Sequence, residues 1–260
     1  MGQTIKRDEI LSALEAALLP LDYVQAMWEG GAASFDRLDQ WSDLDLQIVV
    51  DDDQVEEASR VVEQALLKLS PFAIRYELPQ PTWHGHYQVF ITLENASPFL
   101  MVDLVIMKIS NPNRFLEPQI HGQAVVHFDK KGVTNPPPWD ENAWRKKLAD
   151  RLGSMIAVFD LFQPLVDKDV RRGRWLDALS FYQGMTLRPL VEALRMKYSP
   201  HHYNFHTRYI HLELPAEVVE RLKALYFLPD PQHLRAAWEE AMAWFKELSA
   251  ELTREFLEDA

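Results

Sequence analysis

The spacing of apolar residues changes at one point in this chain, and the change limits the folds that it can adopt. Before about residue 135, stretches with strand-like alternation are interspersed with stretches at helical spacing, whereas almost everything after that point has helical spacing. Pro136, Pro137 and Pro138 stand at the change, and three prolines can continue neither a helix nor a central strand. We therefore predict an α+β protein with a mixed β-sheet flanked by helices in residues 1–135 and an α-helical bundle in residues 136–260.

Individual elements follow from the same patterns. In the first half we expect a helix that includes residues 10–18, strands over 24–28, 44–50, 72–77, 87–93 and 99–108, and a helix over 55–69 that residues 51–53 cap. In the second half we expect helices over residues 144–162, 175–198, 215–226 and 234–256. Asp140 is expected to cap the first of these, and Pro189 to kink or restart the second.

Composition excludes several kinds of protein. The chain has no cysteine, so it has neither disulfides nor thiolate metal sites. Its net charge of −12 would repel a polyphosphate backbone, which argues against extended nucleic-acid binding but leaves short anions at a local site open. No apolar run reaches the roughly eighteen residues of a membrane span. We expect a cytoplasmic protein with no membrane partner.

The stretch GGAASFDRLDQWSDLDLQIVV, residues 30–50, places two carboxylates at the start of an apolar strand. Because side chains alternate along a strand, Asp43 and Asp45 point to one face, while Leu44 and Leu46 point to the other. Each carboxylate raises the pKa of the other unless a cation lies between them, and Mg²⁺ takes such oxygen ligands together with phosphate oxygens. The alternative is an ordinary solvated strand end.

A third carboxylate, Asp103, lies in the run FLMVDLVIMK, where its neighbours are apolar. Burying it without a partner would cost on the order of several kcal/mol, and a metal shared with Asp43 and Asp45 would supply that partner. The alternatives are that Asp103 faces solvent or pairs with an arginine. Gly30 and Gly31 would allow the backbone to approach a phosphate closely, although any tight turn also uses glycine.

Taken together, these residues resemble the signature of the nucleotidyltransferase superfamily, which includes DNA polymerase beta and the aminoglycoside adenylyltransferases. The signature is Gly-Ser, a spacer, Ser-Asp-x-Asp on a strand, and a third Asp on a later strand. Here Gly31 matches the glycine, and four further residues match the rest: Ser42, Asp43, Asp45 and Asp103. The chain departs from the signature at Ala32, where the family has a serine that is expected to bind phosphate.

The resemblance implies transfer of a nucleoside monophosphate, AMP from ATP or the equivalent from another NTP, to a hydroxyl group of a small molecule. Pyrophosphate would be released, and two Mg²⁺ ions would assist. Asp43 and Asp45 would hold the ion that carries the triphosphate, and Asp103 would help to hold the second. Either Asp103 or a glutamate of the helical domain would take the proton of the hydroxyl. An aminoglycoside-like antibiotic is the leading acceptor, and the acidic composition fits a cationic substrate.

The same resemblance assigns residues 1–135 to NTP and Mg²⁺ binding and residues 136–260 to substrate binding. Nucleotide contacts are expected from Gly30, Gly31, Ser34, Arg37, Ser42 and Arg174. Of these, Ser34 or Arg37 would replace, together with backbone N–H groups, the hydroxyl that Ala32 lacks; otherwise nucleotide affinity is reduced. Arg174 would reach the triphosphate from the second domain. The alternative is a catalytically weak or inactive regulatory, antitoxin-like module of the same fold. Ala32 favours this alternative, and the complete set of three aspartates opposes it. The acceptor, the choice of NTP and the oligomeric state cannot be read from the sequence.

Overall fold

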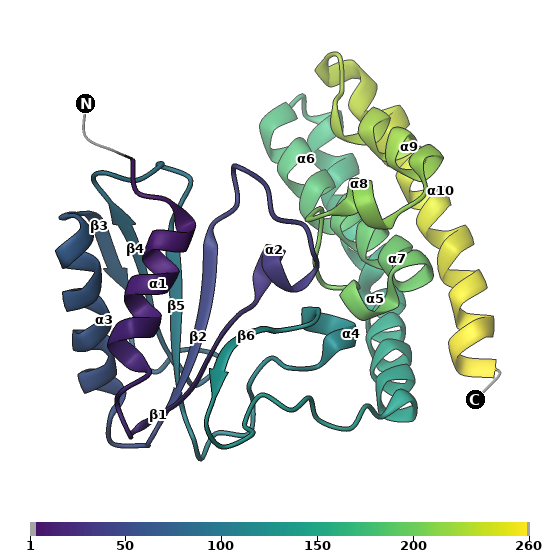
Figure 1. The fold of residues 1–260 in the computed structure, drawn as a ribbon. Helices are drawn as coiled ribbons and strands as arrows, with labels where there is room; N and C mark the ends of the chain where they lie inside the picture. Colours follow the sequence, from purple (N-terminus) through teal and green to yellow (C-terminus); the bar gives the residue numbers. More distant parts are fainter. Residues whose placement is uncertain (1–3, 259–260) are drawn as a thin grey trace. The chain divides into compact units, whose positions relative to one another are not determined.

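The computed structural model describes residues 4–258, and the chain divides into two compact units. The first unit ends at Pro138 and the second begins at Trp139. The first combines strands and helices, and the second is built of helices (Figure 1). The predicted fold class, a mixed sheet with flanking helices followed by a helical region, is therefore confirmed.

A six-stranded mixed sheet in the order β3-β4-β5-β2-β1-β6 forms the centre of the first unit. The pair β2 and β5 is parallel, and the other neighbouring strands run antiparallel. The strands are β1 (Val24–Glu29), β2 (Leu44–Val50), β3 (Phe72–Glu77), β4 (Tyr87–Leu93), β5 (Val102–Lys108) and β6 (Val125–Asp129). The helices of this unit are α1 (Arg7–Leu18), α2 (Gly31–Ser34), α3 (Val55–Leu69) and α4 (Pro118–His121).

The two faces of this sheet differ in composition. Helices α1 and α3 lie on one side of the sheet (Figure 1). Their apolar side chains pack with Leu44, Leu46 and Leu104 in one continuous core. On the other face, a smaller apolar cluster that includes Val49 and Met107 covers only the later part of β2 and β5. The start of both strands on that second face is therefore left to polar side chains.

Most strands predicted from alternation have the predicted bounds. β2, β3 and β4 cover the expected residues, β1 is longer by one residue, and β5 begins at Val102 rather than at residue 99. The predicted cap of α3 is wrong, because the helix is preceded by Gln54, which makes no side-chain cap bond. Asp52 accepts a hydrogen bond from the backbone N–H of Ser110 instead, at 3.0 Å.

The second unit contains a long helix followed by shorter ones. Its helices are α5 (Glu141–Arg171), α6 (Trp175–Phe181), α7 (Arg188–Tyr198), α8 (Ile210–Glu213), α9 (Ala216–Tyr226) and α10 (Leu234–Thr253). Asp140 caps α5 as predicted, accepting from the backbone N–H of Ala143 at 3.0 Å. A π-helical segment, Tyr182–Leu187, joins α6 to α7 with helical backbone throughout, and Pro189 lies in the first turn of α7, so a kink or restart at Pro189 stays a prediction.

The interior of the second unit combines ring packing with buried polar contacts. The rings of Phe159 and Phe245 stack with their centroids 3.8 Å apart. The amide oxygen of Gln163 accepts from Trp238 at 2.9 Å and from Thr186 at 2.8 Å, which satisfies polar groups that would otherwise be costly to bury. Over residues 4–258, no helix is long and apolar enough to cross a membrane.

Candidate active site

The parallel pairing of β2 with β5 sets Asp45 directly beside Asp103. The two residues are register partners, and Leu44 and Val102 form the neighbouring pair. Since partners in a sheet share a face, both carboxylates lie on the polar start of the second face, away from α1 and α3. Asp43 precedes the strand by one residue, and its charge is close enough to act on the pKa of Asp103. The three aspartates that the sequence singled out are thus brought to one end of β2 and β5.

The carboxylate of Asp103 is partly buried, and its pKa is shifted. Burial raises its pKa, and the negative charge of Asp43 raises it further, whereas a hydrogen bond from Gln88 and the influence of His84 act in the opposite direction. The net shift is upward. Within residues 4–258, Asp103 forms no ion pair with an arginine, so that alternative from the sequence is not realised. A carboxylate in this setting gains stability from any cation that approaches it.

Gln88 and His84 are contacts of the site that the sequence patterns did not reveal. The amide Nε2 of Gln88 donates to Asp103 Oδ1 at 2.6 Å, and the Nε2 atom of His84 lies 3.0 Å from the Gln88 amide oxygen. The backbone N–H of His86 donates to Nδ1 of His84 at 3.1 Å, so Nε2 of His84 carries the proton and donates to Gln88. This chain of hydrogen bonds fixes the orientation of the Asp103 carboxylate. These contacts could be found only from the strand order, which places β4 beside β5.

The Gly30–Gly31 turn packs directly against Asp45. The backbone N–H of Gly30 donates to the carbonyl oxygen of Asp45 at 3.0 Å. Gly31 has a φ of +53°, and a Cβ added there would lie 1.7 Å from Asp45 Oδ2. Both the conformation and the space therefore require glycine at this position. The turn and the carboxylate share one small volume, as a phosphate-binding turn beside a metal ligand would.

The two serines that were expected to contact nucleotide have structural roles in this structure. The Ser34 hydroxyl is buried and faces the backbone carbonyl oxygens of Gly31, at 2.8 Å, and of His121. The Ser42 hydroxyl donates to the Asp39 carboxylate at 2.9 Å and accepts from the Asp39 backbone N–H, also at 2.9 Å. Both serines thus shape the segment between β1 and β2, and their nucleotide contacts stay predictions.

The two expected arginines lie in different units. Arg37 lies just after α2, with its guanidinium 4.9 Å from the centroid of the Phe35 ring. Arg174 precedes α6 in the helical unit, where its backbone N–H donates to the Asp169 carbonyl oxygen at 2.9 Å and its guanidinium lies 4.0 Å from the Asp169 carboxylate. The contact of Arg174 with a triphosphate remains a prediction.

The oxygen donors at this end of the sheet suit Mg²⁺ in chemistry and in charge. Asp45 and Asp103 are neighbours in register, and Asp43 raises the pKa of Asp103, which a divalent cation would lower again. Over residues 4–258, no group of three or more histidine, aspartate or glutamate side chains is already arranged to hold a metal ion. The chemistry of these residues therefore suits Mg²⁺, but the three carboxylates do not already surround a single point.

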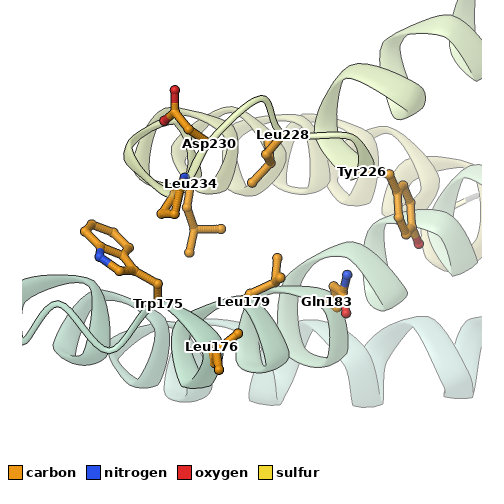
Figure 2. A pocket seen from close by; sticks show the side chains of 9 residues that line it. Trp175, Leu176, Leu179, Gln183, Tyr226, Leu228, Asp230 and Leu234 are labelled. Carbon is orange, nitrogen blue, oxygen red and sulfur yellow. The ribbon is translucent and has the colours of Figure 1, made fainter.

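Two cavities lie elsewhere in the two units. One, of about 530 Å³, is at the opposite end of β2 and β5 and is lined by acidic residues together with Lys108. The other, of about 250 Å³, lies within the helical unit, between Trp175 and Leu179 on one side and Leu228 and Leu234 on the other (Figure 2). Several acidic residues of the first cavity lie near the start of α3, where negative charge stabilises the helix itself.

Comparisons with known proteins give fold-level similarities. An aminoglycoside 6-adenyltransferase from Bacillus subtilis is 12% identical, with a TM-score of 0.38, and the match covers 96% of this chain and 91% of that one. A spectinomycin adenyltransferase from Enterococcus faecialis, solved with ATP and spectinomycin, is 11% identical, with a TM-score of 0.37 and coverage of 95% and 100%. A nucleotidyltransferase-like protein from Exiguobacterium sibiricum is 10% identical, with a TM-score of 0.38 and coverage of 98% and 81%.

Neither family models nor curated proteins match the chain. Two of these three structures are adenyltransferases, and the third is a nucleotidyltransferase-like protein. At these identities and TM-scores they carry no site residue and no substrate over to this chain.

The packing of Gly31 on Asp45 predicts that adding a side chain at position 31 destabilises the fold. Gly31→Ala should lower the free energy of unfolding by at least about 2 kcal/mol, because a methyl-bearing residue is strained at this φ and displaces the Asp45 carboxylate. Urea-induced unfolding measures the change. The matched control is Gly153→Ala in α5, where an added Cβ meets nothing within 4 Å and should stabilise by about 0.5–1 kcal/mol. Wild-type stability in Gly31→Ala would contradict the tight packing.

The raised pKa of Asp103 predicts how the stability of Asp103→Asn depends on pH. Because the pKa is higher in the folded chain than the ordinary value of 3.8, ionised Asp103 opposes folding, and this cost appears as the pH rises through the folded-state pKa. With chelator present, the variant should be more stable than the wild type at pH 7 and equal to it below pH 3.8. Denaturant unfolding at both pH values checks this. A variant that loses stability at pH 7 would mean that a cation within the protein stabilises the Asp103 carboxylate.

Proposed function

We propose that this protein is a Mg²⁺-dependent nucleotidyltransferase that transfers a nucleoside monophosphate, AMP from ATP, to a hydroxyl group of a small molecule and releases pyrophosphate. The observation that carries the proposal is the register of Asp45 with Asp103, with the charge of Asp43 acting on the same site. Carboxylates gathered at one end of a sheet offer the oxygen ligands that Mg²⁺ takes, and a bound cation would offset the charge of Asp43 that raises the pKa of Asp103. The packing of Gly31 on Asp45 adds a turn that suits phosphate.

In this proposal Asp43 and Asp45 bind the metal that accompanies the triphosphate, and Asp103 contributes to a second metal position. The bound ions supply charge neutralisation of the triphosphate and activation of the attacking hydroxyl. Gln88 and His84 hold the Asp103 carboxylate in one orientation. The acceptor oxygen forms a bond to the α-phosphorus, the bond from the α-phosphorus to the pyrophosphate oxygen breaks, and the hydroxyl proton passes to Asp103 or to a glutamate of the helical unit.

The acceptor that we propose is a small hydroxyl-bearing compound with cationic groups, of which an aminoglycoside-like antibiotic is an example. The net charge of −12 supports a cationic substrate through long-range attraction. In this proposal residues 1–135 bind the NTP and the metal, and residues 136–260 bind the acceptor, with Arg174 reaching the triphosphate.

Metal-bridged binding predicts that ATP raises the melting temperature strongly only when Mg²⁺ is present. MgATP should raise the melting temperature clearly, whereas ATP with EDTA should raise it much less, because the triphosphate then lacks its link to Asp43 and Asp45. Differential scanning fluorimetry measures the shifts. Asp45→Asn should remove most of the MgATP shift. As the control, Asp150→Asn on the exposed surface of α5 should keep it. Equal shifts with Mg²⁺ and with EDTA would contradict metal-bridged binding.

Turnover tests the proposed reaction itself. The protein is incubated with each labelled NTP, Mg²⁺ and a panel of hydroxyl-bearing acceptors, and pyrophosphate release is recorded. We expect release with at least one acceptor, and a loss of at least about a hundredfold in Asp103→Asn, equivalent to about 2.7 kcal/mol of barrier. MgATP binding without release on any acceptor would favour the alternative, an inactive nucleotide-binding module. Full turnover in Asp103→Asn would exclude Asp103 from the reaction.

A further inference from the structure

One guanidinium contacts both ends of the segment that connects β1 with β2. Arg7 is the first residue of α1, and its Nη1 donates to the backbone carbonyl oxygen of Asp43. Its Nη2 donates to the carboxylate of Glu29, the last residue of β1. Glu29 precedes the Gly30–Gly31 turn, and Asp43 begins the carboxylate pair. The segment 30–42, which carries the glycine turn and ends beside Asp43, is therefore closed at its base by Arg7.

The Arg7–Glu29 contact is a protected ion pair rather than a surface one. The side chains of Arg7 and Glu29 are only 19% and 5% exposed. The second carboxylate oxygen of Glu29 lies 2.9 Å from Nε2 of His127 on β6. Burial alone would raise the pKa of Glu29, but its contacts with His127 and Arg7 outweigh burial and lower it. Glu29 is thus ionised, and breaking the pair would leave a buried charge without its partner.

We propose that Arg7 and Glu29 are positioning residues of the carboxylate site, which set the distance between the Gly30–Gly31 turn and Asp43. This rests on the proposed function, because it matters for catalysis only if the turn and Asp43 receive the Mg²⁺-bound triphosphate. Arg7 suits this role because its planar fork binds two acceptors in fixed directions. A lysine at this position would keep the charge but not the two directed contacts.

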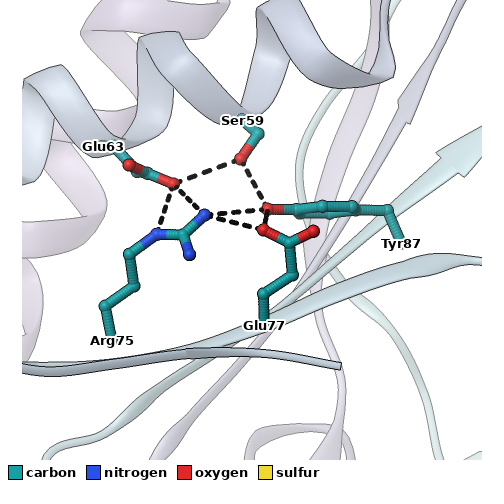
Figure 3. Close-up of polar contacts among 5 residues, drawn as sticks. All are labelled: Ser59, Glu63, Arg75, Glu77 and Tyr87. Atoms are coloured by element: carbon teal, nitrogen blue, oxygen red, sulfur yellow. Dashed lines mark hydrogen bonds and ion pairs between the residues drawn. The ribbon is translucent and has the colours of Figure 1, made fainter. Parts of the chain in front are cut away.

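An ordinary stabilising ion pair is the competing explanation, and the same unit contains a suitable control. Arg75 on β3 also contacts two carboxylates, those of Glu63 and Glu77, together with Tyr87 (Figure 3). Arg75 is the register partner of Ile91, which belongs to the core under α1 and α3. Asp103 is on the opposite face of the sheet. Arg75 is therefore a second arginine that bridges two oxygen acceptors, in its case two carboxylates, and within residues 4–258 it forms no hydrogen bond or ion pair with Asp43 or with the glycine turn.

Hydrogen exchange with mass spectrometry, and MgATP affinity by calorimetry, test the proposal in Arg7→Lys and Arg75→Lys. In Arg7→Lys, amide exchange in residues 30–43 should accelerate by about tenfold while other segments stay near wild type, because only this segment loses its closure. MgATP affinity should fall by about tenfold. In Arg75→Lys, exchange in residues 30–43 and MgATP affinity should both stay within about twofold of wild type. Glu29→Gln, which keeps an oxygen acceptor for Arg7, should have a smaller effect than Glu29→Ala.

The outcomes separate this inference from the proposed function. If the wild type does not bind MgATP, the proposed function fails, while the exchange data still decide whether Arg7 orders residues 30–43. Unchanged exchange and affinity in Arg7→Lys, or equal changes in Arg75→Lys, would overturn the positioning role. If Arg7→Lys does not fold, Glu29→Ala, which removes the acceptor for Arg7, provides the comparison, and wild-type exchange in residues 30–43 with wild-type MgATP affinity in that variant would also overturn it.

Discussion

The parallel pairing of β2 with β5 is the constraint on which the candidate site depends. A parallel pair brings residues at equivalent positions of two strands to the same level and the same face, so Asp45 and Asp103 lie side by side. The pairing itself is secured by burial on the other face, where Leu44, Leu46 and Leu104 pack under α1 and α3. Apolar packing on one face thus fixes the register that places Asp45 beside Asp103 on the other, and the free energy of the core offsets the cost of burying Asp103 near the charge of Asp43.

Two carboxylates of the first unit show how differently the chain treats buried negative charge. Glu29 has cationic or protonatable partners on two sides, Arg7 and His127, and its pKa is lowered despite burial. Asp103 has a neutral amide, Gln88, as its hydrogen-bond donor, and its pKa is raised. Arg7 and His127 outweigh the burial of Glu29, whereas Gln88 and His84 do not outweigh the burial of Asp103 and the charge of Asp43. In the proposed function, a bound cation would supply the remaining compensation at Asp103.

Strands and helices with regular apolar spacing could be predicted from the sequence, because their patterns are local. β2, β3, β4 and α3 have the predicted bounds, and the shared face of Asp43 and Asp45 follows from strand alternation alone. The contacts of Asp103 with Gln88 and of Arg7 with Asp43 could not be predicted, because they depend on strand order and helix placement. Arg195 illustrates the same limit. Its helical spacing with other charged residues is typical of a solvated face, yet it is fully buried, with Glu213 as its partner.

Ala32 stands where the nucleotidyltransferase signature has a serine, so in the proposed function other groups must bind the phosphate. Ala32 offers no hydroxyl, and the hydroxyl of nearby Ser34 is directed to the carbonyl oxygens of Gly31 and His121. A triphosphate beside this turn would therefore meet backbone rather than side-chain hydroxyl donors. Backbone donors are effective only when the turn is held in place, which makes the closure of its base by Arg7 more important here than in a chain with the serine. In the proposed function, the missing hydroxyl would also leave a larger share of nucleotide affinity to the metal and the three aspartates.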